Sequence, residues 1–382
     1  MNFAPRNDGD LLSPLFNMLQ NNDWTWSLFI FITAMMLMLL IGNPLINWLR
    51  ALPNMKWSAR EDTPDTHLKK AGTPSMGGLG IIGAAIGAVW GFGWIYTAMQ
   101  LRGQASSIVP IAVRNTALTE QLESTIFLAI IAGFMWLGFV DDKSKAQGRG
   151  GLLARHKLVW QLVLTVAFLV FAFLVMFMNA VQTPGVITVI EWTSFKIETF
   201  FPLIALLILL IGTCNAVNLT DGIDGLAAGC MAISGVALAV CNEGPLFDSA
   251  WLGIAITGAC LGFLFFNKYP ARVFMGDTGS LALGAALGMC AVLNRCVLLL
   301  PFIGFIFYIE MFSVMAQVIY FKITRKKLGE GKRLFRRAPI HHHYELGGWS
   351  ETRVVATFWI IHLVMTSIGV VLWKMQVIPR WP

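Results

Sequence analysis

Long apolar runs separated by short polar segments constrain this sequence more than any other feature. An α-helix needs about 20 apolar residues to cross a bilayer, with a range of about 17–25. Ten segments meet or approach this length, at about 24–49, 76–99, 122–140, 158–181, 200–219, 225–241, 249–266, 279–294, 297–321 and 354–376. Because backbone groups in lipid must bond within their own segment, such runs predict helices. The sequence therefore predicts an all-α polytopic membrane protein with about ten transmembrane helices.

The composition supports a lipid environment. Hydrophobic residues make up 56% of the chain and charged residues only 13%, about half of the roughly 25% that is typical of soluble domains. The six cysteines form no C-x-x-C pair and nearly all lie in apolar runs, which indicates small buried side chains rather than disulfides or a zinc site. No linker or repeat divides the sequence, so we expect one integral domain over 1–382, with a polar N-terminal extension at 1–23.

The positive charges predict an orientation. A net charge of +7 could indicate a nucleic-acid-binding protein, but the lysines and arginines lie in short loops between apolar runs. With the N-terminus outside, the inside loops hold 21 of them and the outside segments hold seven. This asymmetry follows the positive-inside rule. It predicts a multi-pass membrane protein with both termini outside, an even number of spans and no nucleic-acid partner.

Unusual polar residues concentrate in the predicted inside loops. The first loop ends KKAGTPSMGG, where Lys70 precedes a Gly-Gly helix start that favours phosphate binding. The second begins GFVDDKSK, with Asp141 and Asp142 at a helix C-terminus, where acids oppose the helix dipole. Lys145 and Lys157 follow closely. Acids beside cations at a membrane boundary indicate a site for phosphates and a divalent metal, although an ordinary charged loop is the alternative.

Two further loops add acids and amides. In NAVNLTDGIDG, Asn218 precedes Asp221 and Asp224, and a helix beginning at Asp221 would put both acids on one face. Simple N-capping by Asp221 would explain only one of them. In FNKYPARVFMGDTGS, Asn267 and Asp277 flank a loop that ends in Gly-Asp-Thr-Gly. Asp277 could cap the next span and also bind Mg²⁺, since a carboxylate, waters and substrate phosphates are the usual ligands of that ion.

The last inside loop carries RRAPIHHHYELGGW, with three consecutive histidines. Consecutive residues rarely point at one zinc ion and no cysteine lies nearby, so phosphate or base contacts fit the basic surroundings better. Glu310, inside the ninth apolar run, is expected to pair with a polar group of a neighbouring helix. The three residues of the motif are His341, His342 and His343.

One predicted surface thus gathers acids, amides, lysines and histidines, which is the equipment for Mg²⁺-assisted phosphoryl transfer. From the residues alone, the function is metal-dependent phosphate chemistry on a membrane-bound acceptor. An ion-coupled transporter with acids at the bilayer midplane is the alternative from another class. It predicts two related halves, and none is visible in the sequence.

These motifs together resemble the phospho-N-acetylmuramoyl-pentapeptide-transferase (translocase I) family, within the superfamily of polyprenyl-phosphate N-acetylhexosamine-1-phosphate transferases. GTPSMGG, GFVDDKSK, NAVNLTDGIDG, FNKYPARVFMGDTGS and APIHHHYELGGW occur in the order of the family, over about residues 67–376. The histidine motif separates this family from related enzymes that share the aspartate motifs. The resemblance implies a homodimer in a lipid membrane that converts UDP-MurNAc-pentapeptide and undecaprenyl phosphate to lipid I and UMP, with Mg²⁺, in peptidoglycan synthesis.

The resemblance also implies roles for matching residues. Asp277 is the expected magnesium ligand, and Asp141 and Asp142 are expected to handle the lipid phosphate or the metal. The residues expected to contact substrate are Lys70, Lys145, Lys157, Asn218, Asp221, Asp224, Asn267, His341, His342 and His343. A different UDP-sugar, such as UDP-N-acetylglucosamine, is the alternative donor.

Overall fold

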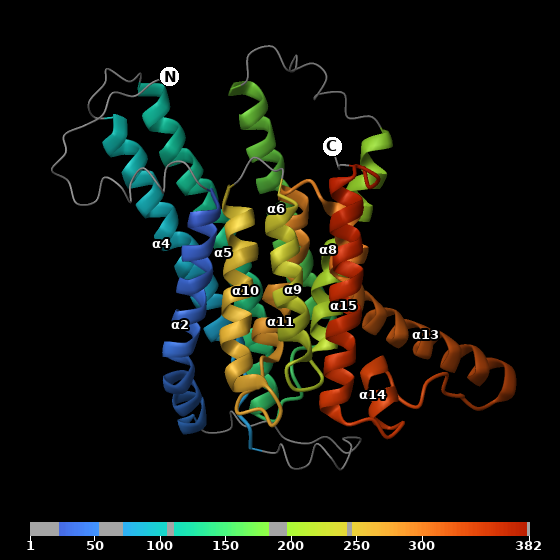
Figure 1. The fold of residues 1–382 in the computed structure, drawn as a ribbon. Coiled ribbons are helices and arrows are strands. Elements are labelled where there is room, and N and C mark those ends of the chain that lie inside the picture. Colours follow the sequence, from blue (N-terminus) through green and yellow to red (C-terminus); the bar gives the residue numbers. More distant parts are fainter. Residues whose placement is uncertain (1–22, 53–71, 105–110, 183–196, 243–246, 380–382) are drawn as a thin grey trace.

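The computed structural model describes residues 23–52, 72–104, 111–182, 197–242 and 247–379 (Figure 1). Every element in this part of the chain is a helix, as the sequence predicts. Lys70 and nearly all of the N-terminal extension lie outside the described residues. The elements are α2 (Asp23–Ala51), α4 (Gly78–Gln104), α5 (Ile111–Ala146), α6 (Ala154–Gln182), α8 (Ile197–Thr220), α9 (Leu226–Val240), α10 (Phe247–Asn267), α11 (Gly276–Leu293), η1 (Val297–Leu299), α12 (Leu300–Ile303), α13 (Phe305–Leu328), α14 (Ile340–Glu345) and α15 (Glu351–Lys374).

The predicted polytopic architecture is confirmed. Among the described residues, nine helices are long and apolar enough to cross a membrane. The sixth predicted span corresponds to α9, which is apolar but has only 15 residues and is mostly buried among other helices. Burial by protein rather than lipid explains how so short a helix is accommodated. All six cysteines are free and buried, as expected.

The ninth predicted span, 297–321, is not one continuous helix. The chain forms η1 and α12, breaks at Gly304, and continues as α13, which leaves the side of the bundle in Figure 1. Side chains of two neighbouring helices compensate for the break: Ser234 donates to the Ile303 carbonyl, and the Ile306 N–H donates to His362 Nδ1 at 3.4 Å. An interrupted helix is tolerated at membrane depth only when other groups satisfy its free backbone.

Helix α11 is the centre of the bundle. It packs against α4, α5 and α8, and less extensively against α9 and α10. Its sequence GDTGSLALGAALGMCAVL is rich in small residues, which let helices approach closely within a membrane. A Cβ atom built on Gly138 of α5 would lie 2.1 Å from the backbone oxygen of Asp277, and one on Gly78 of α4 would lie 2.1 Å from Gly279 Cα. These glycines allow α4 and α5 to contact the start of α11 directly.

We predict that Gly138→Ala lowers both the thermal stability and the activity of the protein. The added methyl group meets backbone atoms, which cannot rotate away, and overpacking of this kind typically costs about 1–3 kcal/mol. Gly212→Ala on α8 is the matched control, since nothing lies within 4 Å of a Cβ atom at that position. Thermal unfolding in detergent measures the difference. Equal melting temperatures for the two variants would contradict the close α5–α11 packing.

Candidate active site

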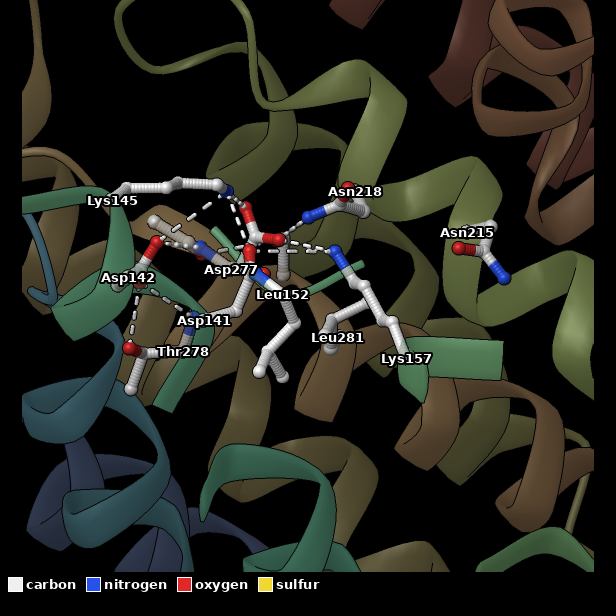
Figure 2. Close-up of polar contacts among 12 residues, drawn as sticks. Asp141, Asp142, Lys145, Leu152, Lys157, Asn215, Asn218, Asp277, Thr278 and Leu281 are labelled. Atoms are coloured by element: carbon white, nitrogen blue, oxygen red, sulfur yellow. Dashed lines mark hydrogen bonds and ion pairs between the residues drawn. The ribbon is translucent and has the colours of Figure 1, made fainter. Parts of the chain in front are cut away.

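Three carboxylates from two helices meet at one end of the bundle. Asp141 and Asp142 lie near the C-terminal end of α5, and Asp277 lies in the first turn of α11. Each offers an oxygen atom, and these oxygens all lie within 4.8 Å of one another. Figure 2 shows the three side chains converging. The two acid motifs that the sequence analysis treated separately therefore form one cluster.

Two lysines compensate for this negative charge. Lys145 Nζ lies 2.7 Å from both Asp141 Oδ2 and Asp277 Oδ1. Lys157, in the first turn of α6, pairs with Asp277 Oδ2 and lies 3.8 Å from Asp141 Oδ2. The lysine side chains remain 35% and 17% exposed, whereas those of Asp141 and Asp142 are 3% and 5% exposed. Both ammonium groups therefore lie between the acids and the solvent.

Asp142 caps α11 from a different helix. Its carboxylate accepts hydrogen bonds from the Asp277 N–H at 3.1 Å, the Thr278 N–H at 2.9 Å and the Thr278 hydroxyl at 2.7 Å. These N–H groups have no partner within their own helix, and the partial positive charge there stabilises an anion. From the sequence alone, Asp277 could have been the cap of this helix. That prediction is wrong, because Asp277 lies within the first turn and no side chain of α11 caps it.

The 221–225 loop, residues Asp221 to Gly225, joins α8 to α9 beside this cluster. The predicted helix beginning at Asp221 is wrong, since α8 ends at Thr220 and α9 begins at Leu226. Gly225 adopts φ +82°, in the left-handed region that favours glycine, and thereby turns the chain before α9. The two acids consequently point to different partners rather than along one helix face.

Each polar residue of the loop makes a defined contact. Asp221 Oδ2 accepts from the Gly276 N–H at 3.1 Å, immediately before Asp277. Asp224 Oδ2 accepts from the Ala271 N–H at 2.9 Å, and the Asp224 N–H donates to Glu351 Oε1 at 2.7 Å. Burial, followed by the negative charges of Asp277 and Asp142, raises the pKa of Asp221 to about 7.

The predicted amides hold backbone and side-chain groups around α11. Asn267 accepts from the Gly225 N–H at 3.0 Å and donates to the Val273 carbonyl at 2.9 Å. Asn218 donates to Ser280 Oγ at 2.8 Å. Asn267 is buried and makes structural contacts on both sides of its side chain.

The three histidines have different surroundings. His341 is fully buried, with Nδ1 3.1 Å from Glu310 Oε1, so the expected pairing of Glu310 is present. His342 Nδ1 lies 2.7 Å from Glu345 Oε2. Burial lowers the pKa of His342 to about 4, which leaves this ring neutral at pH 7. His343 Nδ1 accepts from the Arg336 N–H at 3.1 Å.

The structure thus brings most, but not all, of the predicted residues together. Asp141, Asp142 and Asp277 form one cluster with Lys145 and Lys157. The loop acids contact the backbone around this cluster. Of the histidines, His341 contacts the same loop at Gly222, whereas His342 pairs with Glu345 and His343 accepts from the Arg336 N–H. Sequence reasoning missed Thr278 and Glu351. Only Thr278 carried a signal, because it follows Asp277 directly.

Comparison with known proteins identifies the family. A phospho-N-acetylmuramoyl-pentapeptide-transferase of Desulforudis audaxviator is 40% identical over 351 residues, which cover 88% of this chain and 95% of the relative. The chain belongs to the phospho-N-acetylmuramoyl-pentapeptide-transferase family. Members from Bacillus subtilis and Geobacillus thermodenitrificans are 39% identical over 349 residues and 42% identical over 319 residues. The first covers 90% of this chain and 96% of the relative, and the second covers 82% and 87%.

A broader family model, glycosyl transferase family 4, matches residues 124–295. This segment contains α6, α8, α9, α10 and α11 in full, together with most of α5. It therefore includes all three carboxylates of the cluster and the 221–225 loop. The histidine segment, with Glu310 and α14, lies outside the match. The relatives from Desulforudis audaxviator, Bacillus subtilis and Geobacillus thermodenitrificans confirm the resemblance to the phospho-N-acetylmuramoyl-pentapeptide-transferase family that the loop motifs indicated.

We predict that His342→Gln makes the protein less sensitive to acid. The pKa of His342 is about 4 in the folded protein, against an ordinary value of 6.5. The unfolded chain therefore binds an extra proton between these values, and folding stability falls as the pH drops from about 6.5 to about 4. Thermal unfolding of both proteins across this range is the measurement. If their melting temperatures fall in parallel, His342 is not the group responsible.

Proposed function

We propose that this protein transfers phospho-MurNAc-pentapeptide from UDP-MurNAc-pentapeptide to undecaprenyl phosphate, yielding lipid I and UMP in peptidoglycan synthesis. The observation that carries the proposal is the carboxylate cluster with its two lysines at the end of a membrane-embedded bundle. Membership of the family supports the donor and the acceptor, because the relatives are named for transfer of the phospho-sugar pentapeptide. The membrane helices suit a polyprenyl acceptor, whose chain remains in lipid.

The cluster fits a magnesium ion. Carboxylate oxygens are the ligands that Mg²⁺ prefers, usually together with water and substrate phosphates. Three carboxylates and two ammonium groups together carry one excess negative charge. With an added dication and an anionic diphosphate, the total charge of the site would be nearly balanced. Asp277 is the proposed principal ligand, because it is the least buried of the three acids and Asp142 is already engaged with Thr278. When bound, Mg²⁺ would neutralise negative charge on the diphosphate.

The residues of the chain then have separate tasks. Lys145 and Lys157 are flexible cations at the open side of the cluster, where they can turn from the carboxylates to the phosphates of the substrates. Asp142 keeps the start of α11 in place. Asp141 is held by Lys145 and by the Leu152 N–H at 2.7 Å, and it is the acid available to accept a proton from the acceptor phosphate.

We propose a direct displacement. An oxygen of the lipid phosphate attacks the sugar-linked β-phosphorus of the donor, and the bond from that phosphorus to the oxygen bridging the α-phosphate breaks. UMP leaves with the bridging oxygen, and the new phosphorus–oxygen bond completes the diphosphate of lipid I. Since a phosphate monoester has a second pKa of about 6, the acceptor is largely a dianion at neutral pH. The base therefore contributes little, and positioning and charge neutralisation contribute most.

The charges of the loops support an orientation of the protein in the membrane. The end of the bundle with the acids is proposed to face the cytoplasm, because the basic loops of the sequence lie on that side. The protein is proposed to reside in the bacterial inner membrane as a homodimer, with periplasmic termini.

We predict that purified protein in detergent releases UMP when both substrates and Mg²⁺ are present, without a sealed compartment. Asp277→Asn should lower kcat by about a hundredfold or more and weaken the dependence on Mg²⁺, because loss of one charge-stabilising group commonly costs that much. Ser249→Ala is a control that keeps all the acids, because Ser249 pairs with Asn294 at the end of α11 opposite Asp277. An unchanged Mg²⁺ dependence in Asp277→Asn would remove this residue as the ligand.

Two arms of the same assay test the donor and the route. UDP-N-acetylglucosamine should neither support UMP release nor compete effectively with UDP-MurNAc-pentapeptide. Radiolabelled UMP should not exchange into the donor when the lipid acceptor is omitted. Exchange without acceptor would instead indicate a covalent aspartyl-phosphate intermediate and overturn the direct displacement.

A further inference from the structure

Glu310 is a fully buried acid in the first half of α13, outside the carboxylate cluster. Its side chain and that of His341, in the first turn of α14, are both 0% exposed. Glu310 Oε1 lies 3.1 Å from His341 Nδ1, which is an ion-pair distance without hydrogen-bond geometry, and the backbone N–H of His341 donates to Glu310 Oε2 at 3.5 Å. A buried ionisable group is costly unless it is paired, and removing one partner strands the other. The two residues therefore hold α13 and α14 together as a pair.

The other edge of the His341 ring meets the 221–225 loop. His341 Nε2 is buried and has no hydrogen-bond partner among the described residues. A Cβ atom built on Gly222 would lie only 2.3 Å from this nitrogen and 2.7 Å from the adjacent ring carbon. The imidazole thus rests directly on the backbone of Gly222, and only glycine leaves room for it.

Gly222 follows Asp221, whose carboxylate holds the N–H group of Gly276 at 3.1 Å. Gly276 in turn precedes Asp277. A continuous series of contacts therefore runs from Glu310 through the His341 ring and the loop to the first residues of α11. Each step is an ion-pair contact, a packed contact or a hydrogen bond. Glu310 and His341 are fully buried, Asp221 and Gly276 are half-buried, and Gly222 is exposed.

We propose that Glu310 and His341 form a positioning pair, which sets the 221–225 loop against α11 and thereby fixes the orientation of Asp277. This inference rests on the proposed function. It gives His341 a different task from the substrate contact that the family resemblance implies. Complete burial, with one ring nitrogen facing Glu310 and the other facing Gly222, leaves the ring no surface for a nucleotide.

The test compares full-length variants in the UMP-release assay with separate kcat and KM values. Glu310→Gln and His341→Ala should each lower kcat by about tenfold or more, while KM for the UDP-sugar stays within about threefold, because the pair acts on the reacting geometry and not on donor binding. Glu310→Gln combined with His341→Ala should be no slower than His341→Ala alone, since residues that act through one contact are not additive. His341→Gln, which keeps a side-chain N–H near Glu310, should recover part of kcat.

Gly222→Ala changes the contact between the His341 ring and the 221–225 loop from the side of the loop. The added methyl group should displace the ring and lower kcat, and it should cause no further loss when His341 is already alanine. This pair of variants remains informative if Glu310→Gln is too unstable to purify.

Ser313→Ala is the matched control. Ser313 is buried on α13 and donates to the Glu310 backbone carbonyl at 2.7 Å, but it does not contact His341. It should keep the wild-type kcat, and thermal unfolding of every variant separates loss of fold from loss of positioning. The positioning pair would be overturned by a raised KM with an unchanged kcat in His341→Ala, or by additive effects of Glu310→Gln and His341→Ala. UMP release by the wild-type protein would uphold the proposed function in either case. Wild-type protein that releases no UMP would overturn the proposed function itself.

Discussion

Mutual repulsion of three carboxylates is the constraint on which this structure depends. Two unit charges about 4 Å apart repel by about 4 kcal/mol at an effective dielectric constant of about 20, and Asp141, Asp142 and Asp277 lie within comparable distances. The protein offsets this repulsion in two ways. The N-terminus of α11 donates its free N–H groups to Asp142, and two lysines neutralise Asp141 and Asp277. Both solutions require α5, α6 and α11 to meet at their ends.

The 221–225 loop transmits this arrangement to the rest of the bundle. It contacts the start of α11 through Asp221, α10 through Asn267 and α15 through Glu351. It also contacts α14 through the His341 ring on Gly222. A loop joined to four helices can hardly shift without moving Asp277. The density of polar residues in this short segment between two apolar helices thus reflects support for the site as much as contact with substrate.

Much of the fold could be predicted from the sequence because lipid imposes simple rules. The length of each apolar run predicted the helices, and the small residues of α11 are consistent with its central position. The sequence could not predict the break at Gly304 or the short α9, since both depend on protein partners such as Ser234 and His362 that replace lipid or satisfy free backbone groups. The acids of the cluster were predicted as candidates, but the separate role of each acid was not. Asp142 caps a helix 135 residues away in the chain, and no local pattern reports such a contact.

The carboxylate cluster is proposed to bind a divalent cation next to the phosphates of the donor. Anomalous scattering from crystals grown with Mn²⁺ and a non-reacting donor analogue tests it most directly, because Mn²⁺ accepts the same oxygen ligands as Mg²⁺. We expect one strong peak per chain at the Asp277 carboxylate, with Lys145 or Lys157 turned towards phosphate. A cluster that still holds both lysines against Asp277, with no manganese peak beside it, would show that the acids do not bind the cation.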